Sequence, residues 1–157
     1  MRDLLRQLMD RWSADGIKLP AGATDADIQR FEARCGVRLP ADMAEYFRTV
    51  NGMGTRGPID LMDSRQYCFW DLDSVVNIVD ELGDTAIEEY LPNAREFFIF
   101  ADECVCIKYV CINLASADNA VICITPELGI TSDDITYVCD GFTAAIRLCL
   151  AGTYPLY

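Results

Sequence analysis

The chain has 157 residues, of which 25 are acidic, 13 are basic and none is histidine, so its formal net charge is −12. This length is typical of one domain, and no apolar run approaches the ~20 residues that a membrane-spanning helix needs. The missing histidine excludes histidine-dependent catalytic triads and dyads, and the acidic balance disfavours nucleic acid as a partner.

The cysteines and the N-terminus indicate the compartment. None of the eight cysteines belongs to a Cys-x-x-Cys pair, and most of them lie in apolar runs. This pattern favours reduced, buried thiols over a disulfide framework. A redox or metal role for some of them is the alternative. Asp3 and Asp10 interrupt the N-terminal segment, which lacks the apolar core of a secretion signal. We therefore expect a cytoplasmic protein without a cofactor or a structural metal.

Three helices are expected in the first third of the chain. Apolar residues recur at helical spacing from Met1 to Trp12, and a second helix should run from its N-cap Thr24 to Cys35. Gly36 can close that helix in the left-handed conformation. Pro40 suits the start of a third helix, which should end at Asn51-Gly52.

The segment from Gly36 to Gly52 resembles the signature of the SUKH superfamily, which contains bacterial immunity proteins and fungal cell-wall-assembly regulators. The shared pattern is a helix that ends in glycine, then Leu-Pro-x-Asp, an aromatic residue and a closing Asn-Gly. The resemblance covers roughly residues 24–150. It implies one SUKH-like domain over residues 1–157, with residues 1–23 as an N-terminal helical extension. The residues that carry the motif are Gly36, Leu39, Pro40, Asp42, Phe47, Asn51 and Gly52.

The middle of the chain mixes short helices and strands. Gly52, Gly54 and Gly57 match the Gly-x-Gly-x-x-Gly pattern of nucleotide-binding loops, but a helix precedes them and Pro58 follows, so we interpret them as a connection. Asp73 is expected to cap a short helix that ends at Gly83. The other elements expected here are strands at 59–62 and 67–70 and a helix at 85–91.

From Glu96 onward the chain is rich in short β-type runs separated by turns. A hairpin connection is expected between Asn113 and Asn119, and a last helix should start near Phe142. Sequential strands favour antiparallel pairing, so the predicted fold class is α+β: N-terminal helices, a central antiparallel sheet of about four to six strands and a C-terminal helix. The expected strands are residues 97–100, 105–107, 109–114, 120–124 and 135–139.

Acidic residues are concentrated between positions 60 and 103, where twelve acidic side chains accompany only Arg65 and Arg95. Such a segment is either a solvated face or a surface for a basic partner. The candidate aromatic anchors for such a partner are Tyr67, Phe69, Trp70 and Tyr90, and core packing is the alternative role of each. An Asp71-x-Asp73 metal pair is a third interpretation, although Asp73 already has a capping explanation. The candidate partner-binding residues are Asp60, Asp63, Tyr67, Asp71, Asp80, Glu81, Asp84, Glu88, Glu89 and Tyr90.

The resemblance implies a bacterial immunity protein that neutralises a cognate toxin, such as a nuclease, by direct and non-catalytic binding. The expected partner is a toxin with a basic surface rather than nucleic acid or a membrane. A regulatory scaffold of the fungal type is the alternative, and an enzyme that uses paired carboxylates and a metal is a third hypothesis.

Overall fold

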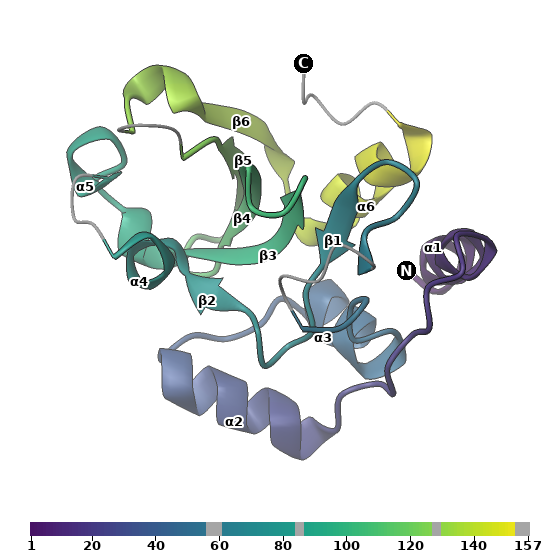
Figure 1. The fold of residues 1–157 in the computed structure, drawn as a ribbon. Helices are drawn as coiled ribbons and strands as arrows, with labels where there is room; N and C mark the ends of the chain where they lie inside the picture. The colour runs from purple at the N-terminus through teal and green to yellow at the C-terminus, as the bar shows by residue number, and fades with distance from the viewer. Residues whose placement is uncertain (56–60, 84–86, 127–129, 153–157) are drawn as a thin grey trace.

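A computed structural model of the chain describes residues 1–55, 61–83, 87–126 and 130–152 (Figure 1). The order of helices and strands confirms the α+β class. The helices are α1 (Arg2–Ala14), α2 (Asp25–Cys35), α3 (Ala41–Thr49), α4 (Ile78–Leu82), α5 (Ile87–Tyr90) and α6 (Phe142–Ala151), with short 3-10 turns η2 (Ala94–Glu96) and η3 (Ser132–Asp134). The strands are β1 (Tyr67–Phe69), β2 (Val76–Asn77), β3 (Phe97–Glu103), β4 (Lys108–Asn113), β5 (Ala120–Ile124) and β6 (Ile135–Asp140).

The strands form one six-stranded antiparallel sheet in the order β1-β3-β4-β5-β6, and β2 pairs with β3 beside β1. Strands β3 to β6 follow one another as a meander, as the sequence predicted. The connection between β4 and β5 is tight because the Asn119 side chain donates hydrogen bonds to the carbonyls of Asn113 (2.9 Å) and Ser116 (3.0 Å). The strand order places β6 at one edge of the sheet.

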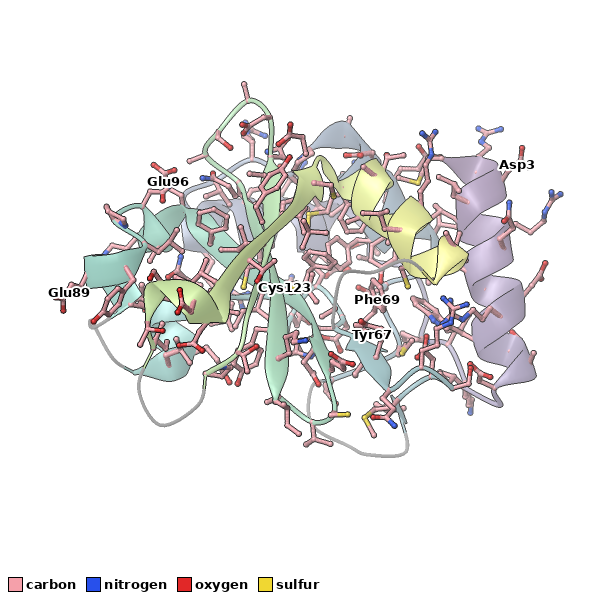
Figure 2. All side chains as sticks on the ribbon, turned by 90° about the horizontal axis from the view of Figure 1, so that it is seen from above. Asp3, Tyr67, Phe69, Glu89, Glu96 and Cys123 are labelled. Carbon is pink, nitrogen blue, oxygen red and sulfur yellow. The ribbon has the colours of Figure 1, made fainter. Side chains whose placement is uncertain are left out.

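Two hydrophobic layers cover the two faces of the sheet. Phe98 and Phe100 point into the larger layer, which α1, α2, α3 and α6 complete. Phe97 and Ile99 alternate with them and point into a smaller layer, which α4 and α5 cover. Both views place α4 and α5 at the end of the molecule away from α1 (Figures 1 and 2).

Local signals explain the helix boundaries that the sequence predicted correctly. Thr24 and Asp27 form a reciprocal capping box at the start of α2, and Gly36 ends that helix with a left-handed φ of 68°. No helix among the described residues is long and apolar enough to cross a membrane.

Two expected features differ in the structure. The strand expected at 105–107 is a turn, because Cys104, Val105 and Cys106 all have positive φ, between 50° and 65°. Asp73 does not cap a helix: Asn77 caps α4 by accepting from the Val79 N–H (3.0 Å), since the chain first pairs with β3 through β2.

Two other predictions overlap the segments that are not described. For the strand expected at 59–62, Leu61 and Met62 are not in a strand, and residues 59 and 60 lie outside the described residues. The helix expected at 85–91 is present as α5, Ile87–Tyr90, with residues 85 and 86 outside the description.

Candidate partner-binding surface

The Leu-Pro-x-Asp motif joins two helices that are far apart in the chain. Asp42, at the start of α3, accepts hydrogen bonds from both the backbone N–H (2.9 Å) and the hydroxyl (2.5 Å) of Thr143, at the start of α6. Leu39 is buried, and its N–H donates to the Glu32 carboxylate of α2 (3.0 Å). Pro40 is the N-cap residue of α3. These contacts fix α2, α3 and α6 relative to one another.

The Asn-Gly end of the motif joins α3 to the sheet. The Asn51 side chain accepts a hydrogen bond from the Leu72 N–H (3.0 Å). Gly52 has a φ of 71°, and a Cβ atom there would lie 2.4 Å from the Trp70 carbonyl oxygen. Phe47 is fully buried in the larger layer. The motif residues therefore hold the helices and the sheet in place, and they present no reactive group.

Two candidate residues of the acidic segment are buried. The Asp63 side chain is 0% exposed, pairs with Arg11 of α1 (3.0 Å) and accepts the N–H groups of Arg65 (2.9 Å) and Tyr67 (3.0 Å). Tyr67 itself is buried in the larger layer. Neither residue belongs to an exposed surface, because the fold uses the Asp63 carboxylate to hold the turn before β1.

Other carboxylates of the segment have partners within the domain. Glu88 pairs with Arg95 at 2.8 Å, and Asp71 accepts the Ser74 N–H at 2.9 Å in a turn. The buried Asp102 accepts from the Trp70 indole and from the Cys106 N–H (3.0 Å). Two further candidates, Asp60 and Asp84, lie outside the described residues.

The remaining candidates gather at the end of the molecule formed by α4 and α5. Ile78, Val79 and Ile87 anchor these two helices on the sheet, which leaves their polar residues on the outside. Turn η3, which leads into β6, lies at the same end of the molecule as α5 in both views, and the neighbouring Ile130 and Ile135 pack against the same hydrophobic layer (Figures 1 and 2). We call this surface the acidic end; its carboxylates are Asp80, Glu81, Glu89, Asp133 and Asp134, together with Glu88, which is paired with Arg95.

One of the four candidate aromatic anchors is exposed. Tyr90, at the end of α5, is 41% exposed, whereas Phe69 and Trp70 are buried like Tyr67. Phe69 packs against Trp12 and Phe100, with ring centroids 5.2 and 6.1 Å away. The core-packing alternative is therefore the one observed for Phe69 and Trp70.

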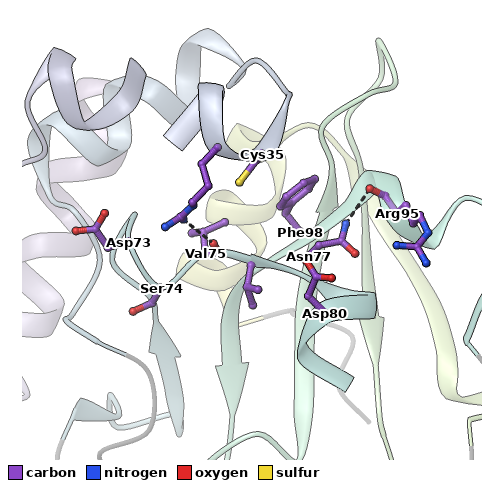
Figure 3. Close-up of a pocket in the computed structure, with 10 residues that line it drawn as sticks. Cys35, Asp73, Ser74, Val75, Asn77, Asp80, Arg95 and Phe98 are labelled. Carbon is purple, nitrogen blue, oxygen red and sulfur yellow. Dashed lines mark hydrogen bonds between the residues drawn. The ribbon is translucent and has the colours of Figure 1, made fainter. Parts of the chain in front are cut away.

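A polar cleft of about 690 Å³ borders the acidic end (Figure 3). It lies between the end of α2 and the segment that leads through β2 into α4. Its walls carry Arg34 and Arg95 as well as Asp73 and Asp80, so charges of both signs line it. Arg34 donates to the Val75 carbonyl at 3.5 Å. Within the described part of the chain, no three potential metal-ligating side chains come together, here or elsewhere.

The profile of the SMI1/KNR4 family (SUKH-1) matches residues 22–147. The chain belongs to the SMI1/KNR4 family. A search of curated proteins found no match.

Within this SMI1/KNR4 domain, α1 lies outside the matched residues but is part of the same core. Leu5, Leu8 and Trp12 are almost completely buried in the larger layer. Arg11 also donates to the Cys149 carbonyl of α6 at 3.1 Å. The helix predicted as an N-terminal extension therefore packs as an integral element of the core.

The acidic end of the SMI1/KNR4 domain includes residues that the sequence did not indicate. Asp133 and Asp134 belong to turn η3, in which Asp134 accepts a hydrogen bond from the Thr131 hydroxyl (2.8 Å). Asp133, which precedes Asp134 in the same turn, is exposed. About forty residues separate η3 from α5, so only the folded sheet brings these carboxylates together.

Proposed function

We propose that this chain is an immunity protein that binds a toxin with a basic surface through its acidic end, without catalysing a reaction. The observation that carries the proposal is the gathering of carboxylates from α4, α5 and η3 on one end of the molecule. A surface of one charge attracts a partner of the opposite charge and accelerates encounter. Tyr90 supplies an exposed aromatic side chain within that surface, as binding hot spots commonly do.

Two further observations support this proposal. The chain has no histidine, the side chain that most often performs acid–base catalysis near neutral pH. No disulfide joins any of the eight cysteines, all of which are among the described residues, and this agrees with a reducing compartment and with action in the cytoplasm. The family match supports the domain type, and the toxin partner is our inference from the surface.

The test is neutralisation of a toxin domain encoded beside the gene for this chain. Co-expression of the wild-type chain should restore growth. The double variant Asp80→Lys/Glu89→Lys should associate with the toxin about tenfold more slowly at low salt, because the steering charge is reversed. The control Asp3→Lys/Asp10→Lys makes the same change in net charge on α1, at the other end of the molecule. A role for the acidic end would be contradicted if both variants slowed association with the toxin equally, or if neither variant slowed it.

A regulatory scaffold is the second candidate function, because the matched family carries the name SMI1/KNR4 and fungal regulators belong to the superfamily that the motif resembles. A scaffold would bind several partners weakly, whereas an immunity protein binds one toxin tightly. Gene neighbourhood distinguishes them: an adjacent toxin gene supports immunity, and a solitary housekeeping location supports the scaffold.

A further inference from the structure

Strand β6 forms an edge of the sheet. It pairs with β5 from Ile135 to Asp140, and within the described residues no strand pairs with its other side. An edge strand presents unpaired N–H and C=O groups, which can accept an additional strand. Natural proteins usually protect such an edge with lysine, proline, a β-bulge or a covering element. The six residues of β6 contain neither lysine nor proline, and its pairing with β5 has one register shift, between Val121 and Ile122.

The side chains of β6 are unusually accessible. None of its six residues is buried, whereas all but one in each of β3, β4 and β5 are. Tyr137, opposite Ile122 in the register, is 58% exposed. An exposed tyrosine offers a large contact area and a hydrogen-bonding hydroxyl, so it can anchor a partner.

Carboxylates stand at both ends of β6. Asp133 and Asp134 immediately precede the strand, and Asp140 is its last residue. The sequence contains no basic residue between Lys108 and Arg147. Two copies of the chain that paired antiparallel through β6 would bring the start of one strand next to the end of the other, and thus carboxylates next to carboxylates. Charge therefore disfavours a second copy as the occupant and favours a basic segment.

We propose that β6 accepts an extended segment with lysine or arginine side chains from a protein partner, as an added strand of the sheet. Backbone hydrogen bonds along β6 would give affinity, Tyr137 would pack against the added strand, and the flanking carboxylates would meet its basic side chains. Because η3 leads directly into β6, this edge continues the acidic end. The inference rests on the proposed function in that the partner is taken to be the same basic protein.

The test uses the full chain, labelled for amide NMR, and a synthetic peptide of alternating lysine and valine about ten residues long. The peptide should shift the amide signals of residues 135–140 and slow their hydrogen exchange. One control peptide carries N-methyl groups on two consecutive central residues, which keeps the charge but obstructs both edges of the strand; it should bind about tenfold more weakly. A glutamate–valine peptide should not bind.

A pair of variants tests the anchor. Tyr137→Ala should weaken binding of the lysine–valine peptide severalfold, whereas Ile107→Ala, which truncates a similarly exposed side chain in the β3–β4 turn, should not. Equal binding of the N-methylated peptide, or signal changes confined to α4 and α5, would overturn the added-strand proposal. Absence of peptide binding would overturn it as well.

The outcomes of the two sets of experiments separate the two proposals. Growth rescue that depends on Asp80 and Glu89, combined with unchanged β6 signals, would refute only the added strand. Peptide binding along β6 without neutralisation of the toxin would refute only the immunity function.

Discussion

Asp42 and Thr143 lie 101 positions apart in the sequence, yet one carboxylate oxygen of Asp42 accepts both the backbone N–H and the hydroxyl of Thr143. The contact joins the first turn of α3 to the first turn of α6. It gives the aspartate of the Leu-Pro-x-Asp motif a physical role: this carboxylate serves as a capping group for a different helix from its own.

Replacing Asp42 by alanine should lower the free energy of unfolding by about 2–3 kcal/mol, because the two hydrogen bonds from Thr143 and a third from the Met43 N–H are lost with the carboxylate. Thr143→Val removes only the hydroxyl and should cost about 1 kcal/mol. Urea denaturation measures both, and the double variant gives their coupling. Asp10→Ala on the exposed face of α1 is the control, with a change below about 0.5 kcal/mol. Strictly additive losses would show that the two residues do not interact.

The buried pair of Arg11 and Asp63 should contribute far more to stability than an exposed pair on the same helix. Asp63→Ala leaves Arg11 without its carboxylate and two backbone N–H groups without an acceptor, so we expect a loss of about 3–5 kcal/mol. The exposed Asp3–Arg6 pair is the matched comparison, and Arg6→Met should cost less than about 0.5 kcal/mol. Chemical denaturation of the two variants would reject this ranking if their losses were similar.

Two glycines with nearly equal φ angles should differ in their tolerance of alanine. Gly36 has a φ of 68°, and no atom lies within 4 Å of the position that a Cβ would occupy, so Gly36→Ala should cost only the conformational penalty of about 1 kcal/mol. Gly52, with a φ of 71°, would add a collision with the Trp70 carbonyl, so Gly52→Ala should cost on the order of 3 kcal/mol or more. A thermal melt comparing both proteins decides the point, and equal shifts would argue against the close approach.

Stability should decline in alkaline solution because of the buried thiols. Burial raises the pKa of Cys68 and of Cys123 from 9.0 to about 12, so the folded chain retains protons that the unfolded chain releases. This stabilisation is complete below pH 9 and is lost as the pH rises towards about 12. Each thiol contributes a slope of up to about 1.4 kcal/mol per pH unit. Unfolding under reducing conditions from about pH 8 to about pH 11 should show a shallower decline for Cys68→Ala/Cys123→Ala than for wild type; parallel curves would contradict the assignment.

The sequence predicted the elements whose signals are local. The capping residue Thr24, the closing Gly36 and the turn at Asn113–Asn119 each act within a few residues, so their positions could be read directly. The helix cap at Asn77 was missed because pairing of β2 with β3 delays the start of α4. Tertiary pairing of this kind is not visible in a local pattern.

The candidate surface could be predicted only in part for the same reason. Asp63 and Glu89 are equally acidic in sequence, but Arg11, more than fifty residues away in the chain, draws Asp63 into the interior, while Glu89 stays exposed. Asp133 joins the acidic end through the fold of the sheet. Composition identified the acidic third of the chain, whereas long-range contacts decide which of its carboxylates reach solvent.

The contacts of α6 with α1 and α3 have a consequence for synthesis of the protein. Phe142 and Ile146 are fully buried in the larger layer, which also contains residues of α1 and α3, and Arg11 donates to the carbonyl of Cys149. The larger layer cannot close while translation is still in the middle of the sheet, because its last apolar helix has not yet emerged from the ribosome. Folding must therefore be completed after residue 149 has left the exit tunnel, and the protein can bind a partner in its folded form only then.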